Sequence, residues 1–210
     1  MVETELERLA AARAATLGLI AGLSQAELDA APPGGGWSIG EVLDHLLRAE
    51  ATNRGDLAAL VALARSGREP YLRRSLEELD IAPAFVPRPL LNLMSLPLSF
   101  ATLLAPAALR ESVVRSRAFP ARAARVLEPR RGRPAGELRA ALAASLAETR
   151  ALFAANSDLD FRRLVVQHPL LGANDALGVL RLTAAHELRH QDQIRDIRRR
   201  LGAAGTYTVS

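Results

Sequence analysis

The sequence contains no cysteine and no lysine among its 210 residues. The absence of cysteine excludes disulfides, thiolate metal ligands and a cysteine nucleophile, so any metal ion would be held by nitrogen and oxygen atoms. The absence of lysine excludes a Schiff-base lysine, since all 27 Lys and Arg positions are arginine. Covalent catalysis by a cysteine thiol or a lysine amine of this chain is therefore excluded.

Aromatic residues make up only 4% of the chain, and β-branched residues are also sparse. Alanine, leucine and arginine dominate, and because helix-forming residues prevail along almost the whole length, we expect an all-α fold. No internal repeat or linker divides the sequence, and its length suffices for one domain with a substantial core. A single domain over residues 1–210 is the prediction.

The N-terminal segment has neither the basic start nor the cleavage site of a signal peptide, which predicts a cytoplasmic protein. An uncharged run, Pro89 to Leu109, is about long enough to span a bilayer. Pro97 and Pro106 interrupt this run, so a kinked buried helix or an apolar contact surface is expected and stable membrane insertion is not.

The net charge of +4 and two arginine clusters raise the question of a nucleic-acid partner. Acidic residues number 23 and are interspersed with the arginines, and few aromatic side chains are available to stack on bases. A solvated, arginine-rich surface explains this pattern, and no nucleic-acid partner is expected.

Four long helices are expected from the spacing of apolar residues and from helix-capping signals. Ser38 and Glu41 have the spacing of a capping box, as have Ser24 and Glu27, and Asn174 is expected to cap the last helix. The helices are expected over residues 3–23, 38–67, 134–156 and 175–201. With an irregular crossover that includes the Pro-rich residues 81–109, they predict an up-and-down-type four-helix bundle.

The segment HELRHQDQI, residues 186–194, carries two of the four histidines and matches the zinc-protease pattern H-E-x-x-H. His186 and His190 occupy the two turns that are missing from the apolar stripe of the last helix, so both rings should face the interior. Residues four apart lie about 5–6 Å apart at Cβ and can converge on one metal ion. Two buried rings without a metal ion would each need other polar partners.

The protease interpretation lacks a third ligand. No glutamate follows Glu187, as a gluzincin requires, and positions 193 and 196 are not the glycine and histidine of a metzincin. Glu187 falls beside the apolar stripe and is expected to meet solvent. Asp192 and Asp196 remain conceivable carboxylate ligands.

Two other histidines could complete the site. His45 lies at the edge of the buried face of the second helix, whereas His168 precedes Pro169 in an expected loop, where a fixed turn contact is the simpler explanation.

Three further residues lie near the expected site. Glu41, one turn before His45, is a candidate proton acceptor, although its capping role explains it equally well. Asn53 and Gln193 lie along the ligand faces and could bind a ligand ring or orient a substrate.

Three segments, WSIGEVLDHLLRAE, HPLLG and HELRHQDQI, occur in an order and spacing that resemble the DinB-like superfamily of bacterial four-helix-bundle proteins. The resemblance covers essentially the whole chain. It implies a divalent metal ion, commonly zinc or nickel and sometimes manganese or iron, bound by three histidines that correspond to His45, His186 and His190. Relatives with assigned chemistry include thiol-dependent S-transferases and isomerases that use bacillithiol or mycothiol, and many members have no known activity.

A three-histidine site in a bundle core leaves coordination positions for water or substrate, as in a catalytic metal site. We therefore expect a metal-dependent enzyme for a small-molecule substrate, either a thiol S-transferase or a hydrolase. Because the chain has no cysteine, a low-molecular-weight thiol would have to be a cosubstrate. The alternative is a non-catalytic metal-binding or ligand-binding bundle. A homodimer joined through the apolar segment is also expected.

Overall fold

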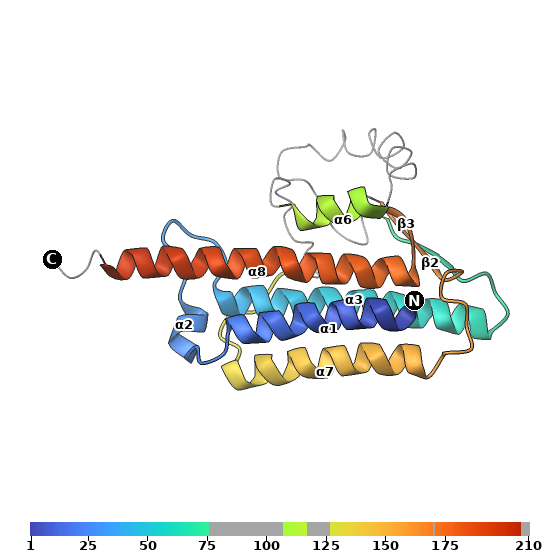
Figure 1. The fold of residues 1–210 in the computed structure, drawn as a ribbon, viewed down its shortest axis with the longest axis horizontal. Coiled ribbons are helices and arrows are strands. Elements are labelled where there is room, and N and C mark those ends of the chain that lie inside the picture. The colour runs from blue at the N-terminus through green and yellow to red at the C-terminus, as the bar shows by residue number, and fades with distance from the viewer. Residues whose placement is uncertain (76–106, 117–126, 170, 207–210) are drawn as a thin grey trace.

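The computed structural model describes residues 1–75, 107–116, 127–169 and 171–206. Four long helices lie side by side along one axis (Figure 1): α1 (Val2–Leu19), α3 (Ile39–Arg65), α7 (Ala135–Ala154) and α8 (Ala176–Thr206). Helices α1 and α3 each pack against both α7 and α8, which closes the four into a bundle. The predicted four-helix bundle is confirmed.

The direction of each helix can be followed by its colour in Figure 1. Helices α1 and α8 run one way, and α3 and α7 run the opposite way. The consecutive long helices α3 and α7 are therefore parallel to each other.

Local capping signals set the start of α3 and of the short α2 (Gln25–Asp29) as predicted. The hydroxyl of Ser38 accepts a hydrogen bond from the N–H of Glu41, and the Glu41 carboxylate accepts one from the N–H of Ser38. Ser24 and Glu27 form the same capping box before α2. Just beyond α3, Gly67 adopts a φ of 70°, a left-handed conformation that favours glycine.

A small three-stranded sheet, which the sequence did not predict, caps the end of the bundle where α3 ends and α8 begins. Strand β1 (Tyr71–Arg73) pairs in parallel with β2 (Val165–His168), and β2 pairs antiparallel with β3 (Gly172–Asp175). His168 is thus the last residue of a strand, and the expected loop assignment was wrong. The cap of α8 was also misassigned, because Asp175, and not Asn174, accepts a hydrogen bond from the N–H of Gly178 (2.6 Å).

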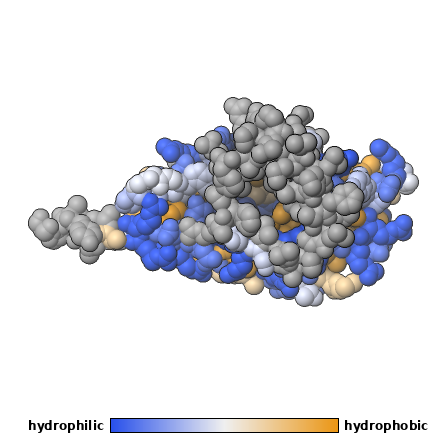
Figure 2. Space-filling view, turned by 90° about the horizontal axis from the view of Figure 1, so that it is seen from above, coloured by the Kyte–Doolittle hydropathy of each residue, from blue (hydrophilic) through white to orange (hydrophobic). Residues whose placement is uncertain are grey.

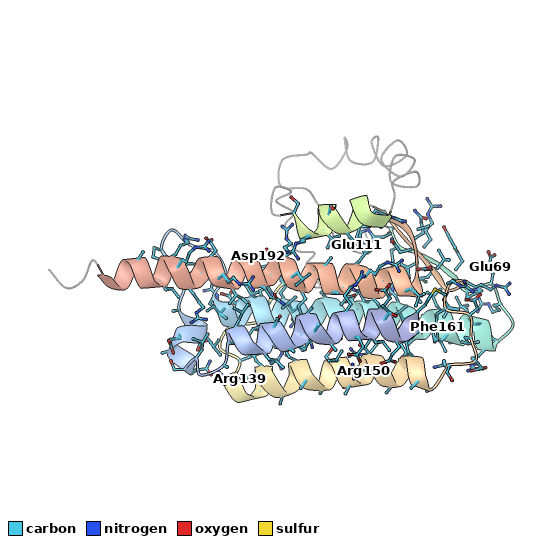
Figure 3. All side chains as sticks on the ribbon, viewed as in Figure 1. Glu69, Glu111, Arg139, Arg150, Phe161 and Asp192 are labelled. Atoms are coloured by element: carbon cyan, nitrogen blue, oxygen red, sulfur yellow. The ribbon has the colours of Figure 1, made fainter. Side chains whose placement is uncertain are left out.

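Helix α6 (Ala107–Arg115) packs across α8. Its Glu111 lies on the side that faces α8 (Figure 3) and forms an ion pair with Arg181 (3.4 Å). Most of the apolar run at 89–109 and of the crossover around it lies outside the described residues. Within the described part, no helix combines the length and apolar character that crossing a membrane would need. Figure 2 shows the described part of this face as mostly hydrophilic, with scattered apolar residues.

Two apolar clusters fill the interior of the bundle. One lies toward the sheet and includes Leu9, Leu60, Phe153 and Leu180, and the other lies toward α2 and includes Ile20, Leu43, Leu142 and Ile194. On each of the four helices, buried polar side chains occupy the turns between the two clusters; they include Arg13, Glu50, Ser145, Thr149, Glu187, His190 and Gln191, and His45 lies beside them at the edge of the second cluster. A polar layer therefore crosses the middle of the core, and it contains the predicted histidines.

Candidate metal centre

His45 of α3 and His186 and His190 of α8 meet in the interior between these two antiparallel helices. The Nε2 atom of His186 lies 3.3 Å from that of His45 and 3.0 Å from that of His190. His45 and His190 are 4% and 5% exposed, and His186 is partly exposed. One ligand atom from each ring falls within 4.8 Å of the other two, so the structure brings together the three histidines singled out from the sequence.

The outward-facing nitrogens of two rings fix how these rings are protonated. Nδ1 of His45 lies 2.9 Å from the carbonyl oxygen of Leu127, and Nδ1 of His190 lies 2.8 Å from Oε1 of Gln193. Both partners are oxygen acceptors, so each Nδ1 carries the proton. The Nε2 atoms of His45 and His190 therefore present lone pairs toward the centre of the cluster.

Protons alone cannot satisfy this arrangement. Nε2 of His186 can direct its one proton at either His45 or His190, and the Nε2 lone pair of the other ring then faces His186 at about 3 Å without a proton directed at it. An additional proton is disfavoured, because burial lowers the pKa of His45 and burial together with the charges of His190, His45 and Arg189 holds the pKa of His186 well below its usual value. Three neutral imidazoles that share one point suit a divalent cation.

The chain segment just before α7 positions His45. Besides the carbonyl of Leu127, the N–H of Arg130 donates to Oδ2 of the buried Asp44 (2.7 Å), and the Arg133 guanidinium donates to Oδ1 (2.6 Å). Burial raises the pKa of Asp44, but hydrogen bonds from Arg130 and Arg133 outweigh it and leave this pKa below its ordinary value. The ionised Asp44 thus anchors the segment that holds the ring of His45.

Glu187 is not where the sequence placed it. Its side chain is 1% exposed, and both carboxylate oxygens accept hydrogen bonds from Arg13 of α1, at 2.8 and 3.2 Å. The expectation of solvent exposure was wrong because α8 packs against α1 as well as α3, so its buried surface is wider than one apolar stripe. A carboxylate bound in this way by arginine is a poor general base, which argues against the peptidase interpretation.

Glu41 caps α3 together with Ser38. Its second carboxylate oxygen accepts from Nε of Arg131 (2.9 Å). Burial opposes ionisation, but the hydrogen bonds from Ser38 and Arg131 outweigh it and lower the pKa of Glu41. Such a stabilised carboxylate takes up a proton weakly.

Of the remaining candidate residues, one contacts the histidine cluster and three do not. Gln193 binds a ligand ring, as expected, whereas the amide of Asn53 donates to Thr183 (2.9 Å). Asp192 and Asp196 form ion pairs with the arginines three positions further along α8 and do not join the histidine cluster.

His168 also lies outside the histidine cluster. Its Nδ1 accepts a hydrogen bond from the N–H of Leu171 (3.2 Å), the fixed turn contact that was expected.

Two groups in and around the site were missed from the sequence. The Leu127 carbonyl is a backbone atom in an irregular segment, and nothing in its side chain marks it. Arg13 stands on the buried face of α1, where arginine interrupts the run of Leu6, Leu9 and Ile20. This interruption was the available signal.

The comparison with protein families agrees with this geometry. The sequence matches the DinB superfamily over residues 8–194, a range that contains all three histidines. No curated protein and no solved structure shows a significant match to the chain. The match covers far more than half of the sequence. The structure agrees with it, since it is a mostly helical bundle with a buried cluster of three histidines that could hold a metal ion. The chain belongs to the DinB superfamily.

Proposed function

We propose that this protein is a divalent-metal enzyme that uses His45, His186 and His190 as its metal ligands. One observation carries the proposal. The Nε2 atoms of three imidazole rings converge, and the protons of these rings cannot provide a hydrogen bond for every close contact. Zinc and nickel, which are common in proteins of this superfamily, are both suited to imidazole ligands, and manganese and iron are the other candidates.

The reaction we propose is transfer to or from a low-molecular-weight thiol of the bacillithiol or mycothiol kind, with hydrolysis as the other possibility at the same site. A divalent ion, when bound, would lower the pKa of a coordinated thiol or water. Because the chain has no cysteine, such a thiol would have to arrive as a cosubstrate. Of the three residues, His186 is the one that is not fully buried, so we place substrate entry on its side of the cluster.

The chain's own residues would orient the site. Leu127 and Gln193 hold the Nδ1 protons of two ligand rings, which keeps the Nε2 lone pairs directed at one point. Trp37 packs against the ring of His45, with ring centroids 4.8 Å apart, and limits its rotation.

Elemental analysis of protein purified without a histidine tag tests the metal site. We expect about one equivalent of transition metal in the wild type and its loss in both His45→Ala and His186→Ala. His168→Ala is the matched control, because its ring lies outside the cluster and metal content should be unchanged. A metal-free wild type, even after reconstitution with zinc, nickel and manganese, would overturn the proposal.

A cobalt-substituted sample tests the thiol. Its visible absorption should gain intensity from a sulfur ligand when a low-molecular-weight thiol is added, and the same thiol blocked at sulfur should have no effect. A spectrum that does not respond to any thiol would leave hydrolysis as the reaction to assay.

The second candidate function is a non-catalytic metal-binding bundle, which the burial of His45 and His190 favours. It predicts bound metal whose spectrum responds to neither thiols nor small anions. A homodimer is part of this candidate, and sedimentation or light scattering would measure it.

A further inference from the structure

A buried ion cluster lies in the same polar layer as the three histidines. Arg13 of α1 donates from Nη2 to Oε2 of Glu50 on α3 (2.6 Å), and from Nε to Oε1 of Glu187 on α8 (2.8 Å). These three side chains are 2%, 2% and 1% exposed. The cluster is therefore buried to the same degree as the apolar core around it, whose residues are 0–9% exposed.

The fourth helix completes the hydrogen bonds of this cluster. The remaining Arg13 nitrogen, Nη1, donates to the Leu142 carbonyl of α7, and the hydroxyl of Thr149 donates to Oε1 of Glu50 (3.0 Å). All three guanidinium nitrogens of Arg13 have acceptors, and all four carboxylate oxygens of Glu50 and Glu187 accept at least one hydrogen bond.

The charges of the cluster do not balance. Two carboxylates share one guanidinium, which leaves one excess negative charge. The neighbouring Arg54, which donates to Ser145 and Thr149, is paired with its own carboxylate, Glu148, at 2.6 Å. Within the described residues, no other cation contacts Glu50 or Glu187.

The excess charge lies close to the histidine cluster. Glu187 directly follows His186 in the chain, and Glu50 is five residues beyond His45, about 7.5 Å along the axis of α3. A buried, unbalanced charge destabilises a fold unless an opposite charge approaches it. Three neutral imidazoles supply no such charge, but a divalent cation among them would.

We propose that the Arg13–Glu50–Glu187 cluster is the counter-charge of the metal site, and that its excess negative charge strengthens the binding of a divalent cation by His45, His186 and His190. The inference rests on the proposed function, since it needs a metal ion at the three histidines. The cluster acts through the electrostatic field across a water-poor core, where charges are weakly screened.

Glu50→Gln is the variant that isolates the charge. The amide oxygen of the new side chain can still accept from Arg13, and its NH₂ group can donate to the hydroxyl of Thr149, which in turn lies 3.1 Å from the Ser145 carbonyl as an alternative acceptor. Arg13 and Glu187 remain a neutral pair with two hydrogen bonds. The shape and the hydrogen bonds of the cluster are thus kept, and only the excess charge is removed.

The measurement is the affinity for Zn²⁺, determined by competition with a chromophoric chelator, together with the thermal stability of each metal-free protein. We expect Glu50→Gln to bind Zn²⁺ at least tenfold more weakly than the wild type. Its metal-free form should be as stable as the wild type or more stable, because a buried excess charge has been removed. Glu7→Gln is the control: it removes the same charge at a side chain that is 61% exposed and pairs with the surface residue Arg150, and the affinity should not change.

Each other result decides against the inference. Equal affinity of wild type and Glu50→Gln would overturn the counter-charge alone and leave the metal site intact. A variant whose metal-free form is clearly less stable or unfolded would show that Glu50 has a purely structural role. A wild type that binds no Zn²⁺ or other divalent ion would overturn the proposed function and the counter-charge together.

Discussion

At the scale of residues, two hydrogen-bond acceptors determine which ring nitrogen of His45 and of His190 carries the proton. Leu127 and Gln193 each accept the Nδ1 proton of one histidine, and this leaves the Nε2 lone pairs of His45 and His190 for a cation. One of these acceptors is a backbone carbonyl and cannot be altered by substitution. Gln193 is therefore the residue through which the tautomer of a ligand can be tested.

Replacing Gln193 with alanine should weaken metal binding roughly 10- to 100-fold, because the ring of His190 loses the acceptor that orients it. Gln193→Glu keeps an oxygen acceptor at the same place and should retain the wild-type affinity or exceed it. Chelator competition measures both. Unchanged affinity in Gln193→Ala would mean that the ring of His190 is oriented by packing alone.

At this scale, the sequence predicted that the two histidines of the last helix face the interior, but it misplaced the charged side chain of Glu187. His186 and His190 interrupt an apolar stripe, and a stripe can be read from one helix. The position of Glu187 depends on a second helix packing against the flank of α8, and the spacing of residues within α8 carries no information about that neighbour.

Among the elements, the β2–β3 hairpin contains a pH-sensitive contact. Burial lowers the pKa of His168 to about 4, and Nδ1 of this ring accepts a hydrogen bond from the N–H of Leu171, which requires an unprotonated nitrogen. Above about pH 6.5 the ring is neutral in both the folded and the unfolded chain. As the pH falls from about 6.5 toward 4, the unfolded chain takes up a proton that the folded chain does not, so stability is lost.

In metal-free protein, we expect the His168 ring to account for a loss of about 2 kcal/mol in the free energy of unfolding between pH 7.5 and pH 5. His168→Gln keeps an acceptor for Leu171 but does not titrate, so its stability should fall less over the same range. Urea unfolding of both proteins at the two pH values measures the difference. Parallel loss in wild type and variant would show that other groups carry the whole effect.

Helix starts that are specified by a few neighbouring residues were predictable from the sequence. Strands that pair with residues far away in the chain were not. The Ser38–Glu41 capping box is written in four consecutive residues and was confirmed. The strands have only three or four residues each, and β1 pairs with β2 across about 90 intervening positions, so no local pattern reveals them. The choice between Asn174 and Asp175 as the cap of α8 likewise depended on where β3 ends.

At the scale of the molecule, the histidine site has ligands on two helices, α3 and α8, so a bound ion would link them. A ligand that binds only the folded chain stabilises it by an amount set by its concentration relative to the Kd. A divalent ion at 100-fold excess over its Kd should contribute about 2.7 kcal/mol, and for a chain of this length raise the Tm by roughly 5–10 °C.

Differential scanning calorimetry with and without Zn²⁺ measures this shift, and a chelator should reverse it. His45→Ala is the matched control, since it lacks one ligand and should show no metal-dependent change in Tm. An equal rise in wild type and variant would indicate binding elsewhere on the chain.

The sequence predicted the bundle because four amphipathic helices of similar length have few ways to bury their apolar faces. It did not predict the polar layer, which exists only where Arg13, Glu50, Thr149 and Glu187, far apart along the chain, reach the same level of the bundle. Whether these residues reach the same height depends on how the four helices pack together, and the sequence of one helix does not reveal it.

The histidine site also sets an order of events during synthesis. His45 and His186 stand 141 positions apart, and the second lies on the last helix of the bundle. A nascent chain that has left the ribosome only as far as α7 carries one ligand of the three and cannot retain the ion. On the proposed function, metal acquisition therefore waits until α8 has been synthesised and has packed against α3, and the divalent ion that is most available at that moment binds the three imidazoles first.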